Sequence, residues 1–265
     1  MKLSLELLES LVATSAEFDQ TVITQSLLQQ VRQDVEDLDV RVSVHHVDDQ
    51  TFRPTLLLEG DDAGVARNLL AQQYGTLIAF NDVTAGVRRI GTLRDPIQVG
   101  FGIFLDAGII DPPKDVLIPL RVLRDQLAGG KALSVRAMTY ALGWVAGYPL
   151  EIEIVSANVK IGKIEARLSQ AEVDAIQTWI RERYERVLFV GATRQHVKSV
   201  IKKTRHLIDI LGIERHGLLA GQVVLKPGTH APGIVRAIGA QLSEARLGAF
   251  RPGGWKTLIA EETGK

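Results

Sequence analysis

The middle of the chain alternates apolar and polar residues in the way that a half-buried β-strand requires. From Phe101 to Asp106 a large apolar residue recurs at every second position, so a strand would place this row on one face and Phe104 on the other. Four more short strands are expected at Arg88–Leu93, Leu117–Leu120, Leu150–Val155 and Gly162–Leu168. Three glycines, which a sharply coiled strand or a bulge needs, accompany the second strand: Gly100, Gly102 and Gly108.

The first 85 residues predict a small α+β domain. A helix over Thr24–Leu38 shows the spacing of an apolar stripe. Strands are expected at Asp39–Val47 and Thr55–Glu59, with an earlier strand or short helix near Leu3–Leu8. A second helix follows, and its expected buried face holds Val65, Ala66, Leu69 and Leu70. This order favours helices on one face of an antiparallel sheet.

Residues 170–265 predict a second α/β pattern. Ser169 is placed to cap a helix over Ala171–Tyr184, because Glu172 follows it at the spacing of a capping box. A short apolar strand is expected at Val187–Val190. The elements expected after it are a helix over Thr193–Leu211 that buries Leu207, Ile208 and Leu211, a strand at Leu218–Leu225, a helix capped by Thr229, and an extended segment at Trp255–Ala260.

A helical insertion is expected between the third and fourth strands of the middle segment. Ser134 is placed to cap a short helix that ends at Leu142. Trp144 and Tyr148 follow, and two interpretations of them stay open. Their rings could be exposed for stacking, or they could close the end of the core, which their packing value favours.

Five short strands with a glycine-rich second one fit a small, partly open barrel of the oligonucleotide-binding (OB) type. About a third of the chain resembles the S1 RNA-binding domain, through the ordered segments Gly91-Thr-Leu, Gly-Phe-Gly-Ile-Phe-Leu-Asp, Val-Leu-Ile-Pro-Leu-Arg-Val-Leu, Leu-Glu-Ile-Glu-Ile-Val and Ile164-Glu-Ala-Arg-Leu-Ser169. In such domains the aromatics of the Phe-Gly-x-Phe motif lie on the binding face, which implies Phe101 and Phe104 here. The usual histidine of the third strand is replaced by Pro119, which removes one stacking ring. The whole chain also resembles an archaeal family of uncharacterised proteins built around such a segment.

These patterns predict an α+β fold in which a central S1-like OB β-barrel is flanked by two small α/β domains, with bounds 1–85, 86–169 and 170–265. The charge follows the same division. Basic and acidic residues number 31 each, yet the three segments carry net charges of −9, +3 and +6. The basic rear two-thirds is compatible with a phosphate backbone, which would repel the acidic front. The alternative is ordinary variation, or contact between the oppositely charged parts.

Basic residues supply the candidate phosphate contacts. In the middle segment these are Arg121, Arg124 and Lys163. On the helix expected after residue 193, one edge carries Arg194, Lys198, Lys202 and Arg205, with Lys203 beside them. A charge row of this kind is also typical of a helix face that only meets solvent.

The loop after the expected strand at Leu218–Leu225 is a candidate anion site. A glycine-bearing turn between a strand and a helix can bind an anion through free backbone N–H groups. The loop lacks the order of a P-loop, so a capped turn is the first interpretation and an anion site the second. The candidate residues are Lys226, Gly228, Thr229 and Arg236.

Composition and motifs exclude several classes. The chain has no cysteine, which removes disulfides and cysteine-ligated metals. No stretch approaches a membrane helix and no signal segment is evident, so we expect a cytoplasmic protein. His45 and His46 are adjacent on an expected strand and point to opposite faces, which disfavours a shared metal ion. No catalytic motif is present, and we expect no metal and no cofactor.

We therefore expect a binding protein and not an enzyme. The leading hypothesis is single-stranded RNA held by stacking on Phe101 or Phe104, in translation, transcription or RNA processing. The acidic N-terminal domain would then dock a protein partner. Two alternatives stay open. One is a protein-interaction module of a ribosomal or transcription assembly, which the proline at position 119 favours. The other is a small enzyme that uses the turn Lys226–Gly233 for a phosphorylated metabolite. The RNA recognised, the protein partner and the oligomeric state lie beyond the sequence.

Overall fold

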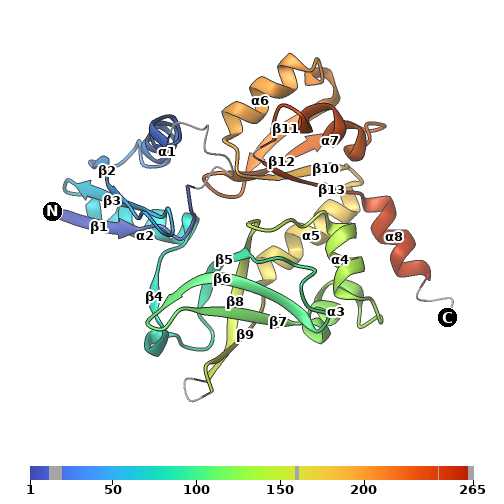
Figure 1. Ribbon diagram of the computed structural model, residues 1–265, viewed down its shortest axis with the longest axis horizontal. Coiled ribbons are helices and arrows are strands. Elements are labelled where there is room, and N and C mark those ends of the chain that lie inside the picture. Colours follow the sequence, from blue (N-terminus) through green and yellow to red (C-terminus); the bar gives the residue numbers. More distant parts are fainter. Residues whose placement is uncertain (12–19, 159–160, 244, 262–265) are drawn as a thin grey trace.

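The computed structural model describes residues 1–11, 20–158, 161–243 and 245–261. Figure 1 shows three units: an N-terminal unit at the left, a barrel below and a C-terminal unit at the upper right. Helix α5 (Gln170–Glu182) lies between the barrel and the C-terminal unit. Its buried side chains share one apolar core with both of them.

The N-terminal unit is a three-stranded antiparallel sheet in the order β1-β3-β2 with two helices. Leu56 and Leu58 lie on the buried face of the sheet, in one core with both helices. Gln30 of the first helix donates a hydrogen bond to the Tyr74 hydroxyl of the second at 3.2 Å, so both helices cover the same face, as predicted. The elements are β1 (Lys2–Glu6), α1 (Gln20–Asp34), β2 (Arg41–Val47), β3 (Pro54–Glu59) and α2 (Ala63–Tyr74).

Helix α2 buries a narrower stripe than the sequence predicts. Ala66 and Leu70 are buried, whereas Val65 and Leu69 are 55% and 40% exposed. The buried residues of α2 recur at three- and four-residue spacing, so residues beside that stripe face solvent. The prediction that Val65 and Leu69 are buried is therefore wrong.

The middle unit is a closed barrel of five strands. Its strands pair in the order β5-β6-β7-β9-β8, and β8 pairs back with β5. Among these five described strands the β7–β9 pair is parallel and the other pairs are antiparallel. The expected barrel is confirmed, but it is closed and not partly open. The strands are β5 (Arg88–Leu93), β6 (Gly102–Ile110), β7 (Lys114–Pro119), β8 (Pro149–Asn158) and β9 (Lys163–Leu168), with β4 (Ile78–Ala79) and the 3₁₀ turn Phe80–Asp82 beside them.

Gly102 is required where β6 and β7 begin to pair. A Cβ at this position would lie 2.4 Å from the carbonyl oxygen of Ile118, which no side chain permits. Gly102 pairs with Pro119, the last residue of β7. The third strand therefore ends one residue earlier than predicted, because Leu120 begins a helix.

The insertion between β7 and β8 holds two helices, α3 (Leu120–Ala128) and α4 (Val135–Leu142). The Ser134 hydroxyl accepts a hydrogen bond from the backbone N–H of Ala137 at 3.1 Å, which confirms the predicted cap of α4. Trp144 and Tyr148 are 4% and 0% exposed. The interpretation that they close the core is confirmed, and the stacking interpretation is wrong.

The C-terminal unit follows a β-α-β-β-α-β order, the split βαβ arrangement. Its antiparallel sheet has the order β11-β12-β10-β13. Helices α6 and α7 cover one face, and the other face meets α5 and α4 (Figure 1). The elements are β10 (Arg186–Val190), α6 (Arg194–Lys203), the 3₁₀ turn Leu207–Asp209, β11 (Ile210–Arg215), β12 (Ala220–Leu225), α7 (Ala231–Gly239), β13 (Arg246–Phe250) and α8 (Pro252–Glu261).

Several sequence predictions for this unit are wrong. The helix expected over Thr193–Leu211 ends at Lys203, because Arg205 adopts a left-handed φ of 64° and the chain turns into a new strand. Three apolar residues expected inside that helix are exposed instead: Leu207, Ile208 and Leu211. The segment expected to be extended at Trp255–Ala260 belongs to helix α8, which Pro252 starts and Trp255 anchors in the core.

Candidate nucleic-acid interface

Two phenylalanine rings meet on the outside of the barrel at the start of β6. The Phe101 side chain is 58% exposed, and its ring packs edge-to-face on Phe104, with 6.0 Å between centroids. Phe104 is half-buried on the outer face of the strand. We call these two residues the ring pair. It presents aromatic surface to solvent, the arrangement on which an unpaired base can stack.

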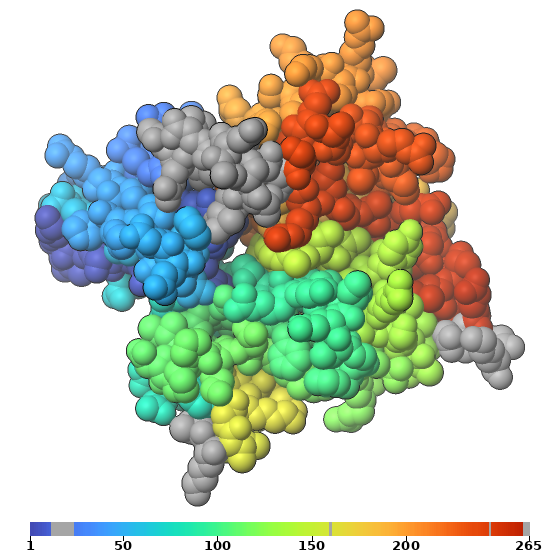
Figure 2. All heavy atoms as spheres, viewed as in Figure 1, coloured from blue at the N-terminus to red at the C-terminus, as the bar shows by residue number. Residues whose placement is uncertain are grey.

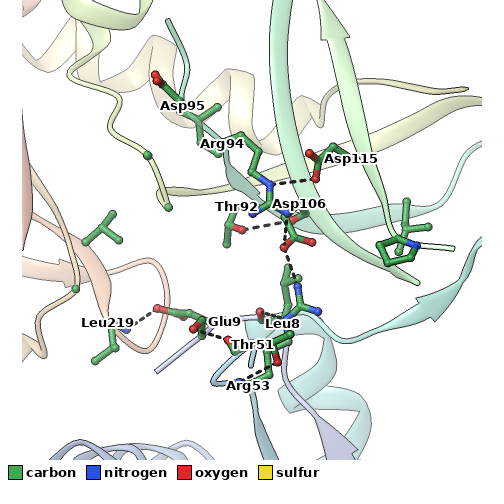
Figure 3. A pocket seen from close by; sticks show the side chains of 18 of the residues that line it. Leu8, Glu9, Thr51, Arg53, Thr92, Arg94, Asp95, Asp106, Asp115 and Leu219 are labelled. Carbon is green, nitrogen blue, oxygen red and sulfur yellow. Dashed lines mark hydrogen bonds and ion pairs between the residues drawn. The ribbon is translucent and has the colours of Figure 1, made fainter. Parts of the chain in front are cut away.

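Asp106 continues the same outer face of β6 beyond Phe104. Its carboxylate accepts a hydrogen bond from Arg53 Nη2 at 2.7 Å and lies 3.2 Å from Arg94 Nη2. Arg94 Nε also donates to Asp115 at 3.0 Å (Figure 3). Arg53 belongs to the N-terminal unit, and its side chain and that of Asp106 are only 12% and 16% exposed. This cluster holds the acidic N-terminal unit against the barrel. Because the side chains of Arg53 and Asp106 are mostly buried, solvent screens their attraction less than it would screen a surface ion pair.

A cavity of about 730 Å³ lies where the three units meet. Figure 2 shows this face of the molecule hollowed between the blue N-terminal part and the green barrel. The volume is typical of small-molecule sites, which occur preferentially where domains join. Its charged lining residues are Glu9, Arg53, Arg94, Asp95, Asp106, Lys114, Asp115 and Arg246.

Glu9 joins the N-terminal unit to the C-terminal unit at one wall of this cavity. One carboxylate oxygen accepts the N–H of Leu218 at 2.5 Å. The other accepts the N–H of Leu219 at 2.6 Å (Figure 3). Enclosure by protein raises the pKa of Glu9 to about 7, although the two hydrogen bonds act in the opposite direction. Near neutral pH this carboxyl therefore carries only part of its charge.

The predicted cations of the barrel do different work. Arg121 is exposed on α3, next to Leu120, whose N–H donates to the Phe101 carbonyl at 2.8 Å. Arg124 Nε donates to the carbonyl of Leu133 at 2.6 Å, and Lys163 lies 2.6 Å from Glu165. Helix α3 thus starts beside Phe101, one residue before Arg121, whereas Arg124 and Lys163 already have partners within the protein.

The predicted basic edge lies far from the ring pair. Helix α6 covers the outer side of the C-terminal sheet, at the top of Figure 1, whereas the barrel lies below that sheet. Five basic residues of this edge are exposed: Arg194, Lys198, Lys202, Lys203 and Arg205. Arg205 lies beyond the end of the helix at Lys203. The ring pair and this edge do not form one surface, and phosphate contact by either stays a prediction.

The predicted anion site already holds a carboxylate of the protein. Glu185 accepts the N–H of Ala231, the first residue of α7, at 2.7 Å. The N-cap is His230 and not Thr229, so the predicted cap is wrong. The candidate residues border this turn, which Glu185 already occupies. Thr229 is half-buried, and three are exposed: Lys226, Gly228 and Arg236.

Sequence reasoning missed most of the residues around the cavity. The strand alternation that placed Phe104 on the outside of β6 also places Asp106 there, so this residue was within reach of the pattern. Arg53 and Arg246 come from other units, and no local signal links them to the barrel.

His45 and His46 are exposed on β2. Across the described ranges no three metal-ligating side chains come together. None of the helices in those ranges is long and apolar enough to cross a bilayer.

Family models place the chain. The DUF2110 N-terminal domain matches residues 18–79, the DUF2110 central domain matches residues 83–180, and the DUF2110 C-terminal domain matches residues 184–250. The protein belongs to the DUF2110 family. No curated protein sequence matches it.

Solved structures give weak similarities. Protein MJ1198 from Methanocaldococcus jannaschii is 12% identical over 34% of this chain and 99% of its own, with a TM-score of 0.24. A chain of the a/eIF2alpha–aDim2p–rRNA complex from Pyrococcus horikoshii is 12% identical over 46% of this chain and 64% of its own, with a TM-score of 0.26. The intact alpha subunit of aIF2 from Pyrococcus abyssi is 9% identical over 64% of this chain and 97% of its own, with a TM-score of 0.26.

Proposed function

We propose that this protein binds single-stranded RNA, without catalysis, on an S1-like OB barrel, and acts in translation, transcription or RNA processing. The observation that carries the proposal is the ring pair. Phe101 keeps more than half of its surface in solvent beside Phe104 on the outside of the glycine-bearing second strand. Because the ring is already exposed, a base can stack on it at little cost in free energy to the protein. Stacking contributes about 1–3 kcal/mol per base.

Single strands suit this surface better than duplexes. Rings that project from a barrel can stack only on bases that are already splayed out. In this proposal Arg121, exposed on the helix whose first residue donates to the Phe101 carbonyl, supplies a positive charge for the adjoining phosphate. In this proposal the acidic N-terminal unit docks a protein partner.

Fluorescence anisotropy with a labelled short RNA at two salt concentrations tests the proposal. Phe101→Ala should weaken binding by about fivefold to a hundredfold, because it removes one stacking surface. Tyr140→Ala is the matched control: Tyr140 is 86% exposed on α4, outside the ring pair. No binding at low salt, no dependence on salt, or equal effects of the two variants would refute the RNA proposal.

A second candidate is a barrel that serves as a protein scaffold. The observation that favours it is the contact between Arg53 and Asp106, through which the N-terminal unit already binds the outer face of β6. Pro119, opposite Gly102, also offers no ring for a base. Capture of a ribosomal or transcription protein that Phe101→Ala abolishes, together with absence of RNA binding, would favour this candidate.

A further inference from the structure

The cavity between the three units is a site separate from the ring pair, since neither Phe101 nor Phe104 lines it. We propose that it binds a nucleotide-sized ligand with a terminal phosphate, either a free nucleoside monophosphate or the phosphorylated end of an RNA. The inference does not depend on the proposed RNA binding by the ring pair.

The negative charges that line the cavity are already engaged by the protein. Four carboxylates line it, the same number as the cations, so the formal charge is balanced. Each carboxylate nevertheless accepts a donor: the N–H groups of Leu218 and Leu219 bind Glu9, Arg53 and Arg94 bind Asp106, Arg94 binds Asp115, and the N–H of Ile97 binds Asp95. Carboxylates held in this way oppose an incoming anion less than free ones do.

Two cations of the cavity have no such partner. Neither Lys114 of β7 nor Arg246 of β13 makes an ion pair with a carboxylate in the described part of the chain. Arg246 is the better placed of the two. Its guanidinium lies close to Gly147, another residue of the cavity lining: a Cβ added at Gly147 would lie 3.8 Å from Arg246 Nη1. An uncompensated guanidinium in a concave site binds phosphate through two parallel hydrogen bonds.

The rest of the lining suits a nucleoside body. Apolar side chains from all three units supply a wall for a flat ring: Leu8, Ile109, Val190 and Leu219. Thr92 and Asp95 line the same space and offer oxygens to ribose hydroxyls. An apolar wall with a few placed polar groups is the usual composition of a small-molecule site, and the volume of about 730 Å³ falls within the usual range.

Isothermal titration of the full chain with AMP and with adenosine tests the phosphate requirement. We expect AMP to bind at least about tenfold more tightly than adenosine. Arg246→Gln should abolish that difference. Arg136→Gln is the matched control, because Arg136 is also exposed but lies on α4 outside the cavity. Both variants change exposed side chains, so circular dichroism should show an unchanged fold.

Short RNAs with a 5′-phosphate, a 3′-phosphate or only hydroxyl ends distinguish the two sources of the ligand. Tighter binding of a phosphorylated RNA that Arg246→Gln cancels would assign the cavity to an RNA end. AMP binding with no effect of terminal phosphates would assign it to a free nucleotide. Equal or absent binding of AMP and adenosine with no terminal-phosphate effect, or the same affinities in Arg246→Gln, would overturn the inference.

The Phe101→Ala variant separates this inference from the proposed function. It should leave AMP binding unchanged, since Phe101 does not line the cavity. AMP binding by a protein that binds no RNA would support the cavity while refuting the RNA proposal. RNA binding by the ring pair, with no phosphate preference at any end and no AMP binding, would support the RNA proposal and refute the ligand proposed for the cavity.

Discussion

Arg215 Nη2 donates a hydrogen bond to Asp34 Oδ1 at 2.6 Å, and this contact joins β11 of the C-terminal unit to the end of α1 in the N-terminal unit. The Asp34 side chain is only 9% exposed. Its other oxygen accepts the hydroxyl of Tyr74, the last residue of α2. One carboxylate thus ties two helices of the acidic unit to the basic unit, so the opposite charges of the two ends of the chain meet at a defined contact.

Asp34→Asn should destabilise the protein by about 3 kcal/mol, because it leaves Arg215 without its charge partner in a partly buried place. Urea unfolding followed by circular dichroism measures the change in the free energy of unfolding. Asp37→Asn is the control, since Asp37 is exposed and a surface substitution should change stability by less than about 0.5 kcal/mol. Equal stability of the two variants would show that the contact does not hold the units together.

Stability should fall as the pH rises from about 4.5 to about 7. Enclosure raises the pKa of Glu9 from 4.5 to about 7, and burial raises the pKa of Glu172 to about 7 as well. In this window these two carboxyls keep protons in the folded protein that they have lost in the unfolded chain, so they favour unfolding as the pH rises. A shift of this size corresponds to at most about 3 kcal/mol for each group. His216, whose pKa is lowered by burial, contributes in the opposite direction, but it is one group against two.

Glu9→Gln tests this dependence, because an amide does not titrate. Urea unfolding near pH 4.5 and near pH 7 should show a smaller loss of stability in the variant than in the wild type. Only the change between the two pH values is compared, since the amide also replaces an oxygen that accepts the N–H of Leu218 or Leu219. The same change in stability between the two pH values in Glu9→Gln and in the wild type would contradict the raised pKa of Glu9.

Gly102→Ala should destabilise the barrel by about 1–3 kcal/mol, the usual cost of forcing extra atoms into a packed place. The added Cβ would lie 2.4 Å from the Ile118 carbonyl oxygen, so β6 and β7 would have to separate. Gly100→Ala is a control two residues away, because nothing lies within 4 Å of its Cβ position. Thermal unfolding of both variants decides the matter; similar midpoints would show that the strands can shift to admit the methyl group.

The basic edge of α6 should not contribute to the binding of a short RNA. A double variant, Lys198→Gln with Lys202→Gln, should leave the affinity and salt dependence for about six nucleotides unchanged, because α6 lies on the far side of the C-terminal sheet from the barrel (Figure 1). Arg121→Gln should lower both. A reduced salt slope in the α6 variant would mean that RNA reaches this helix.

Local signals in the sequence predicted the elements that depend on neighbouring residues. The cap at Ser169 is confirmed, because its hydroxyl accepts the N–H of Glu172 at 3.1 Å within one turn. Phe101 is different: strand alternation groups it with the buried residues Ile103 and Leu105, but its ring is exposed because it lies one residue before β6 begins. The helix predicted to reach Leu211 failed, since apolar residues continue the helical spacing past Arg205 although the backbone turns there.

The cavity could not be predicted, because its walls come from segments far apart in the chain. Arg53 meets Asp106 across 53 positions, and Glu9 meets Leu219 across 210. Apolar periodicity describes what one element buries and carries no information on which units later touch. Helix α8 shows a related limit: the glycines after Pro252 suggest a break, yet packing of Trp255 holds them in a helix.

The ion pair between Arg53 and Asp106 also gives the outside of β6 a direction. A polymer laid along that strand from Phe101 meets the acidic N-terminal unit after a few residues. The path along β6 is therefore open at the end near α3 and blocked at the other end. Threading an internal stretch of a long strand would require the N-terminal unit to lift away, whereas a chain terminus could enter and stop.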